Sequence, residues 1–550
     1  MRQLVLAPVM ISLAVVLIAL LVAFGAQAQQ DHSHHGDVLG TVHFPTTCAK
    51  EVGDTFTRGV ALLHSFGYDE ARRAFEAVAA KDPRCGMAYW GIAMTQYHPV
   101  WAPPTDPELS VGQGAAQKAS AIGASTPRER AYIEAINVFY EDATPATHQA
   151  RARAYRDRME KLAREFPDDA EASVFYSLAL LATAAPGDAT LANQKRSAAI
   201  LNRILKSQPD HPGIVHYLIH SFDYPSLARE ALPAARAYAK IAPSSPHALH
   251  MPSHIFTRLG LWEESIASNI DSARSARERV EKTHPGAASF DALHALDYLV
   301  YAYLQVDDQV KARAAADEAE AARRFDEPSF AAGYAIAAIP ARWTLERRDW
   351  NGAAALDVPT VNLPWRQFPY AMAITHFAKA VGAARSGQLD RARLAVEALR
   401  DVRLQLEASP VAGPYDWTGQ VESMRLAASA WIARSEGRNG EALEQARAAA
   451  ELEEKVGKHP VTPGPVLSAR ELLGELLLEL GRPDEALAAF EASLAESPNR
   501  FNSLAGAARA AVRAGNRDKS REYYQKLVAQ AGDQSQRPEL REARAFLGRS

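Results

Sequence analysis

The chain has 550 residues, of which 61 are lysine or arginine and 65 are aspartate or glutamate, so its formal net charge is −4. This near balance offers no basic footprint for nucleic acid, which is excluded as a partner. Abundant alanine, with few β-branched runs and few Asn-Gly turns, favours a helical repeat array over several β-rich domains.

The N-terminus carries the one segment that is apolar enough for a membrane. Arg2 precedes an apolar run from Leu4 to Phe24, and Ala26-Gln27-Ala28 forms a small-residue cleavage site. This pattern predicts a signal peptide over residues 1–28 and places the mature protein in the periplasm or outside the cell. The run is long for a signal core, so an uncleaved membrane anchor is the alternative, and it is the only membrane contact that the sequence suggests.

The segment after the signal is predicted to be a disordered tail over residues 29–50. His32, His34 and His35 stand there among polar residues that show no helical or strand period. Such a tract can capture metal ions, although a solvated tail without a specific role is the commoner case.

Two cysteines flank the first predicted repeat. Cys48 precedes it and Cys85 follows it, and export would place them in a compartment that permits a disulfide. The bridge would close a loop of about 37 residues and stabilise the first repeat by roughly 3 to 4 kcal/mol. The alternative is a pair of buried free thiols.

Helix pairs of the tetratricopeptide repeat (TPR) type are predicted from residue 51 to residue 530. The pattern is a small residue, an alanine twelve positions later, an aromatic residue four later and a proline eight later. The first copy has Gly59, Ala71, Phe75 and Pro83, and a clear later copy has Gly474, Ala486, Phe490 and Pro498. We therefore expect an all-α, TPR-like solenoid of roughly nine to eleven helix pairs, with a C-terminal cap or tail over residues 531–550.

Prolines mark two predicted interruptions and one kink. Trp101–Thr126 and Asp357–Pro369 are proline-rich and are predicted to be irregular connections. Pro252 removes a helix hydrogen bond, so we expect either a kinked continuous helix through this position or a helix that begins at it.

The stretch from Asp210 to Trp262 contains a regular lattice of histidines. His216 and His220 are four residues apart, as are His250 and His254, and the second pair follows the first by 34 residues. A spacing of four puts two side chains on one helix face, and 34 residues is the period of the tetratricopeptide repeat. The lattice therefore predicts two histidine pairs at the same height on neighbouring helices.

The helix register places further polar side chains beside this lattice. At about 100° per residue, positions 2, 5, 9 and 12 of the first helix in each unit face away from its packing side. In three consecutive units these positions hold His216, His220 and Asp223, then His247, His250 and His254, then His294, Asp297 and Tyr301. His64 and His98 are predicted to join them. Because the first helices of such a solenoid line its concave surface, we expect an imidazole-rich wall that faces an open groove.

These stretches carry a resemblance to a known family. HPGIVHYLIHSFDYP and APSSPHALHMPSHIFTRLGLW, with LGTVHFPTTC, DPRCGMAYWGIAMTQYHPVW and HPVTPGPV, make the chain similar to a widespread family of exported bacterial TPR proteins. The resemblance covers most of residues 39–500. It implies the solenoid fold and export, and it leaves the chemistry open.

The lattice itself predicts a transition-metal site. Neutral imidazole suits copper, zinc or nickel, and histidine pairs on adjacent helices resemble the metal sites of helical bundles. The predicted ligands are His216, His220, His250 and His254, with His247 or His294 as substitutes. The side chains predicted to accept from the outward ring nitrogens are Asp223, Asp297 and Tyr301. The alternative is a groove lined with histidines that binds no metal.

Two other functions are compatible with the same surface. A peptide or protein partner is expected in the groove, where Trp90, Trp101, Trp343 and Trp431 would be either anchors or repeat core. The second is a metal-dependent hydrolase that uses the same histidines as ligands. The sequence has no HExxH motif, nucleophile elbow or glycine-rich phosphate loop, so we assign no catalytic residue.

Overall fold

The computed structural model describes residues 36–100, 103–144, 147–185, 187–411, 415–532, 535 and 537–548. Contacts divide the chain into a short unit, residues 1–38, and a large unit, residues 39–550, to which all of the structure below belongs. The predicted signal peptide and the three histidines of the tail lie outside the described residues. Among the described helices, none has the length and apolar character needed to span a bilayer.

The large unit is built from α-helices, and the described residues contain no β-strand. The helices that precede the central histidines are α2 (Gly53–His64), α3 (Tyr68–Lys81), α4 (Gly86–Met94), α5 (Asp106–Ile122), α6 (Pro127–Tyr140), α7 (His148–Glu165), α8 (Ala170–Ala182) and α9 (Ala192–Leu205). The central helices are α10 (Pro212–Phe222), α11 (Leu232–Ile241), α12 (Pro246–His250), α13 (Pro252–Arg258), α14 (Trp262–Thr283), α15 (Phe290–Gln305), α16 (Gln309–Ala321), α17 (Phe330–Glu346) and α18 (Trp350–Ala355). The later helices are α19 (Pro369–Arg385), α20 (Leu389–Ala408), α21 (Trp417–Ser435), α22 (Asn439–Val456), α23 (Ala469–Glu479), α24 (Pro483–Glu496), α25 (Phe501–Arg513), α26 (Arg517–Gln530) and α27 (Pro538–Leu547).

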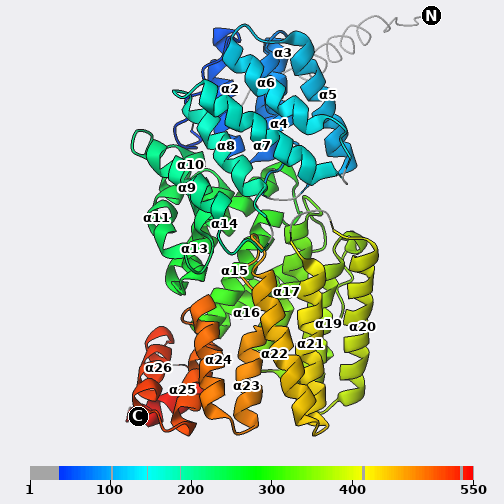
Figure 1. Cartoon of the computed structure of the whole chain (residues 1–550), viewed down its shortest axis with the longest axis vertical. Helices are drawn as coiled ribbons and strands as arrows, with labels where there is room; N and C mark the ends of the chain where they lie inside the picture. The colour runs from blue at the N-terminus through cyan, green and yellow to red at the C-terminus, as the bar shows by residue number, and fades with distance from the viewer. Residues whose placement is uncertain are drawn as a thin grey trace, which may run out of the picture. The chain divides into compact units, whose positions relative to one another are not determined.

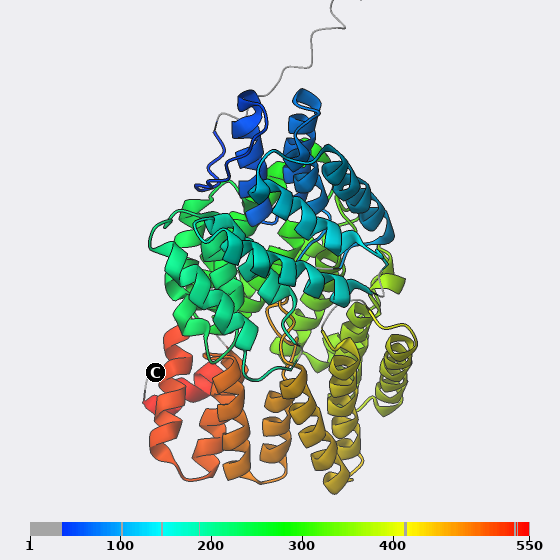
Figure 2. The same cartoon turned by 45° about the horizontal axis from the view of Figure 1, so that its top comes forward.

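Consecutive helices pack in pairs, and each pair stacks on the next. Figures 1 and 2 both show α19 to α24, coloured from yellow to orange, lying side by side in this way. Short turns join the two helices of a pair, so each pair buries its apolar faces against its neighbours. The predicted all-α, TPR-like solenoid is confirmed.

A contact between glycine and phenylalanine explains why the repeat pattern was recognisable. A Cβ added at Gly59 or at Gly91 would lie only 2.8 or 2.4 Å from the ring of Phe75. A Cβ at Gly474 would likewise lie 2.8 Å from the ring of Phe490. The aromatic ring of the second helix therefore packs directly on the backbone of the first, and a larger residue at the glycine would displace it.

The two proline-rich connections differ in structure. Trp101–Thr126 was predicted to be irregular, but it contains α5, because Thr105 and Glu108 form a capping box at the start of that helix. α5 packs on α4 and adds a helix pair to those predicted. Asp357–Pro369 contains only the 3-10 turn Trp365–Gln367 before α19 begins, as expected for an irregular connection.

Part of the predicted disordered tail is packed against the solenoid. Of residues 29–50, the portion 39–50 buries Leu39, Val42 and Phe44 in the core of the first repeats. Disorder is therefore the wrong interpretation for this portion. The short apolar side chains escaped the sequence argument because they show no helical period, yet they fill space between helices.

A disulfide between Cys48 and Cys85 fastens this portion to the first repeat, as predicted, with a sequence separation of 37. We expect Cys48→Ser with Cys85→Ser to lower the free energy of unfolding of the N-terminal repeats by roughly 3 to 4 kcal/mol, because the unfolded chain regains its loop entropy. Denaturant unfolding of the oxidised wild type and the double variant measures the difference, and reduced wild type is the control. Equal unfolding midpoints would contradict the expectation.

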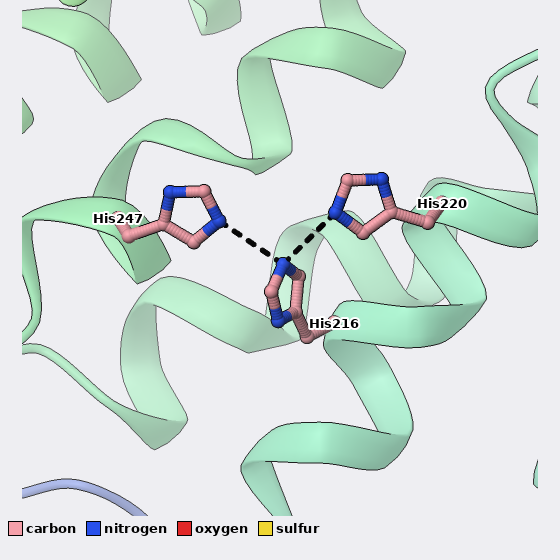
Figure 3. Close-up of side chains that lie close together, drawn as sticks. All are labelled: His216, His220 and His247. Atoms are coloured by element: carbon pink, nitrogen blue, oxygen red, sulfur yellow. Dashed lines mark hydrogen bonds between the residues drawn. The ribbon is translucent and has the colours of Figure 1, made fainter. Parts of the chain in front are cut away.

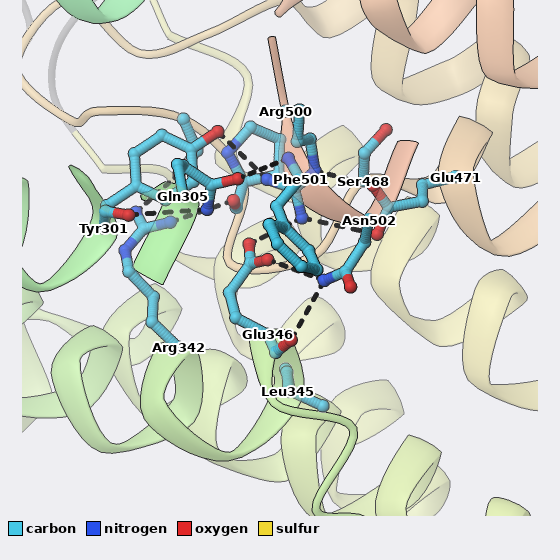
Figure 4. Close-up of polar contacts among 12 residues, drawn as sticks. Tyr301, Gln305, Arg342, Leu345, Glu346, Ser468, Glu471, Arg500, Phe501 and Asn502 are labelled. Atoms are coloured by element: carbon cyan, nitrogen blue, oxygen red, sulfur yellow. Dashed lines mark hydrogen bonds and ion pairs between the residues drawn. The ribbon is translucent and has the colours of Figure 1, made fainter. Parts of the chain in front are cut away.

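A buried ionic network joins the C-terminal repeats to the middle of the solenoid (Figure 4). Arg500, which precedes α25, pairs with Glu471 of α23 at 2.7 Å and with Glu346 of α17 at 2.6 Å. Its guanidinium also donates to the hydroxyl of Tyr301 on α15 at 2.9 Å. Since burying charges is costly unless they are paired, these contacts fix α23 and α25 against α15 and α17.

Candidate metal centre

The lattice histidines lie on two neighbouring first helices of the solenoid, the second of which is divided into α12 and α13. α10 carries His216 and His220, whereas His250 ends α12 and His254 lies in α13. Met251, between α12 and α13, keeps helical angles of φ −53° and ψ −35°, so the chain continues through Pro252 with only a local break. Of the two expected arrangements, the structure has a helix that begins at Pro252, yet the second pair stays together, with the Nε2 atoms of His250 and His254 3.1 Å apart.

The imidazoles gather in two groups of three, of which the first is His216, His220 and His247 (Figure 3). The Nε2 atoms of His220 and His247 each lie 3.1 Å from Nε2 of His216. Nitrogens bound tetrahedrally to one zinc ion at 2.0–2.1 Å are about 3.3 Å apart. The first triad thus has nearly the spacing of ligands that share an ion.

The hydrogen bonds of His216 fix where its proton lies. Its Nδ1 lies 2.7 Å from the backbone carbonyl oxygen of His64. A carbonyl only accepts, so Nδ1 carries the proton and Nε2 presents a bare lone pair. Two other ring nitrogens approach that single lone pair, and at most one of them can donate to it well. A metal ion among the three nitrogens would satisfy all of them.

The second triad is His250, His254 and His294. The Nε2 atoms of His250 and His254 lie 3.1 Å apart, and the ring centroids of His250 and His294 are 4.2 Å apart. All three side chains are buried. The triad lies where α12 and α13 face α15.

Two protons in the second triad are also fixed by their acceptors. Nδ1 of His250 donates to Oδ1 of Asn269 at 2.7 Å, and the amide of Asn269 is oriented because its nitrogen donates to the carbonyl of Ser265. Nδ1 of His254 lies 3.3 Å from the carboxylate of Asp223, which only accepts. Both Nε2 atoms are therefore unprotonated and direct their lone pairs at each other.

Tyr298 does not resolve this repulsion. Its hydroxyl oxygen lies 3.3 Å from Nε2 of His254 and 3.0 Å from the backbone carbonyl of Val461. Its single proton can be donated to one acceptor only, so it cannot satisfy both facing lone pairs. Facing lone pairs at this distance call for a cation between them, either a proton or a metal ion.

Burial argues against the proton. It is the main cause that lowers the pKa of every imidazole in the two triads, and repulsion from neighbouring imidazoles adds to it in most of them. The pKa of His220 falls to about 3. The pKa is also lowered, by burial first, for His216, His247, His250, His254 and His294. Neutral imidazoles are the form that binds a metal.

A third buried group shows what a satisfied histidine cluster looks like. His64 and His211 approach the two oxygens of Glu171 at 2.8 and 2.9 Å. Nδ1 of His64 accepts from the hydroxyl of Tyr217, and Nδ1 of His211 accepts from the amide of Ile214. Each ring nitrogen has a complementary partner, so this group stabilises the core between α2, α8 and α10 and has no lone pair left for a metal.

The residues predicted to surround the ligands contact different partners in the structure. Asp223 contacts His254 as predicted. Asp297 instead pairs with Arg342 of α17 at 2.7 Å, and Tyr301 accepts from Arg500. Both predictions were wrong because a later part of the chain supplies buried arginines to this face of α15. His64 contributes only its carbonyl oxygen to the first triad.

The predicted open groove is also corrected. His216, His250 and His254 are at most 3% exposed. The segment 457–467, which follows α22, lies over the second pair: Lys458 pairs with Asp223 at 2.9 Å, and Val461 contacts Tyr298 beside His254. His98 lies outside both triads, with its ring against Tyr68. Sequence spacing gave no sign of the covering segment or of Asn269, although HPVTPGPV was among the stretches that carried the family resemblance.

A cavity of about 670 Å³ adjoins the first triad. His247 and Phe66 line it. The centroid of the Phe66 ring lies 4.4 Å from the ring centroid of His216 and 5.3 Å from that of His247. The other lining side chains include acidic residues and an aromatic cluster in which Tyr370 and Trp417 stack at 3.9 Å. Such a volume suits a small molecule or a peptide segment.

Comparisons with known proteins place parts of the chain in repeat families. Two tetratricopeptide repeat families match, one over residues 477–545 and the other over residues 56–98 and 428–501. These matches agree with the helix pairs at both ends of the solenoid. None of the curated proteins compared with the chain matches it. The protein is thus a TPR-type helical scaffold, an architecture suited to protein–protein interaction.

Solved structures of helical repeat proteins are similar at low identity. Yeast Tom70 is 12% identical, with 91% of this chain and 96% of that chain covered and a TM-score of 0.32. The APC/C hetero-tetramer Cut9–Hcn1 is 14% identical, with 90% of this chain and 89% of that chain covered and a TM-score of 0.31. The human IFIT1 dimer with m7Gppp-AAAA is 12% identical, with 81% of this chain and 90% of that chain covered and a TM-score of 0.38.

Proposed function

We propose that the protein is an exported TPR scaffold that binds a transition metal, copper, zinc or nickel, through its buried histidine triads. The observation that carries the proposal is the pair of bare Nε2 lone pairs of His250 and His254, which face each other at 3.1 Å. Export rests on the N-terminal sequence alone, and it would place the protein in the periplasm or outside the cell.

The surroundings of the ligands support metal over a purely structural role. Histidines that bind metals donate their other ring proton to a carboxylate, an amide or a backbone carbonyl. Here the acceptors are Asp223, Asn269 and the carbonyl of His64. The Glu171 group has the opposite arrangement, with every nitrogen paired, which makes it an internal reference for histidines without metal.

Elemental analysis of untagged protein, purified from the exported fraction without chelators, tests the proposal. We expect at least one equivalent of copper, zinc or nickel, and loss of that metal in the double variant His216→Ala with His250→Ala. His376→Ala is the matched control, because this partly buried histidine of α19 belongs to neither triad. Wild-type protein that holds no metal, even after incubation with each of the three ions, would refute the proposal.

A second candidate function is the binding of a basic peptide in the cavity. Acidic side chains outnumber lysines and arginines in its walls. The acidic ones are Asp69, Glu70, Glu108, Asp291, Asp326 and Glu327, and the basic ones are Arg72, Arg73 and Arg279. The stacked pair of Tyr370 and Trp417 offers an apolar surface beside them. Charge complementarity therefore favours a ligand that carries lysine or arginine.

Fluorescence polarisation of labelled lysine-rich peptides measures this second function. We expect Glu327→Lys to weaken binding and to make it less sensitive to salt, because the charge lies in the cavity wall. Asp390→Lys is the control, since this side chain is 97% exposed and lies outside the cavity. Equal affinity of the two variants would argue against the cavity as the binding site.

A further inference from the structure

The two triads are separate sets of ligands. Within each triad the candidate ligand atoms all lie within 4.8 Å of one another, and each contains Nε2 atoms 3.1 Å apart. Among the described residues, no group of candidate ligand atoms within that distance combines histidines of the two triads. The four lattice histidines therefore do not converge on one point, and each pair is completed by its own third histidine.

The first triad has access to the cavity. His247 lines the cavity together with Ser245 and Phe66, and the ring centroids of His247 and Phe66 are 5.3 Å apart. His220 is only partly buried. Three imidazoles leave a fourth position of a tetrahedral ion for an external donor, and His247 connects this triad to a space in which such a donor can reside.

The second triad is closed over by the chain itself. Its three rings are at most 6% exposed, and none belongs to the residues described as lining the cavity. Tyr298 lies against His254 and holds Val461 of the covering segment. An ion here can leave only if that cover moves.

The covering segment is held at two further points. Lys458 pairs with Asp223, the same carboxylate that contacts His254. Arg342 donates to the backbone carbonyls of Gly464 and Pro465 at 2.7 and 3.0 Å. Opening the segment therefore breaks several buried polar contacts, which makes local opening costly and slow.

We propose that the array holds two transition-metal ions with different roles. The ion of the second triad is structural and is locked in by segment 457–467. The ion of the first triad exchanges through the cavity and keeps a position open for an external donor, such as an imidazole or carboxylate group. This inference rests on the proposed metal binding. It adds the number of bound ions, the accessibility of each and the different role of each.

Chelator competition on the full chain loaded with Zn²⁺ tests the inference. We expect two equivalents of bound zinc and two phases of release to excess chelator, with rates that differ by about tenfold or more. His247→Gln should abolish the fast phase and leave one equivalent, whereas His294→Gln should abolish the slow phase. Lys458→Met should accelerate the slow phase without changing the stoichiometry.

The outcomes separate this inference from the proposed function. A single equivalent would overturn the two-ion inference, and two equivalents released in one phase would overturn the different roles of the two ions. Either result would leave metal binding intact. Protein that binds none of zinc, copper and nickel would contradict both the two-ion inference and the proposed metal binding. The phases of the wild type decide the matter even where a variant fails to fold. Addition of free imidazole to the Co²⁺-loaded protein should change its visible spectrum, and His247→Gln should abolish that change.

Discussion

Glutamine in place of Glu471 is expected to loosen the C-terminal repeats from the rest of the solenoid. The Glu471 side chain is fully buried and accepts from Arg500, Arg348 and Ser503. Glutamine keeps the shape but leaves two arginines, which are also buried or nearly so, without this counter-charge. Breaking a buried ion pair costs about 3–5 kcal/mol, which makes this one of the largest effects expected of a single substitution in the chain.

Hydrogen exchange on α23 to α26, together with urea unfolding, measures the loss. Glu479→Gln on the same helix is the matched control, because its carboxylate is 40% exposed and lies 3.5 Å from Arg385. Such a surface pair contributes about 0–1 kcal/mol. If both variants unfold alike, the network of Figure 4 does not hold the repeats together.

The same contact gives stability a defined dependence on pH. Burial raises the pKa of Glu471, but Arg500 and Arg348 outweigh it, so the pKa falls from 4.5 to about 2. A carboxyl with a depressed pKa contributes stability that is present above its unfolded pKa and is lost as pH falls through the folded one. The wild-type C-terminal repeats should therefore lose stability between pH 4.5 and 2, and the glutamine variant should lose less over that range.

The sequence was sufficient to predict the solenoid and the two histidine pairs because both follow from local periodicity. Spacing of four within a helix and of 34 between helices fixes which side chains share a face. The same register placed His247 and His294 beside the pairs, and these two histidines complete the triads. The structure groups the histidines in two triads, whereas the prediction had one site of four ligands with these two as substitutes.

What periodicity could not predict comes from distant parts of the chain. Segment 457–467 covers the second triad from more than 150 residues away in sequence, and Arg342 and Arg500 draw Asp297 and Tyr301 into ion pairs and hydrogen bonds instead. A repeat pattern describes each unit against its neighbours. It contains no information about a loop that returns across the solenoid, so it gave no warning that the groove is filled over the second triad.

Asparagine in place of Asp223 is expected to cost both stability and metal. The Asp223 carboxylate is 7% exposed and contacts His254, Arg258 and Lys458. Although burial raises its pKa, the two cations hold that pKa far below its usual range, so the carboxylate is charged. Its loss leaves two cations poorly compensated beside the second triad, at a cost of about 3–5 kcal/mol.

The metal content distinguishes this role from simple packing. With the charge gone, the uncompensated cations repel a metal ion and His254 loses its anionic acceptor, because an amide oxygen accepts more weakly than a carboxylate. The protein should therefore lose the slowly released zinc and keep the rapidly released zinc. Asp297→Asn is the matched control, because Asp297 is an equally buried ion-paired aspartate that pairs with Arg342 and has no histidine partner among its hydrogen bonds and ion pairs described here. Asp297→Asn should therefore destabilise the fold without changing the zinc stoichiometry. Equal loss of zinc in both variants would mean that Asp223 acts on the metal only through the stability of the fold.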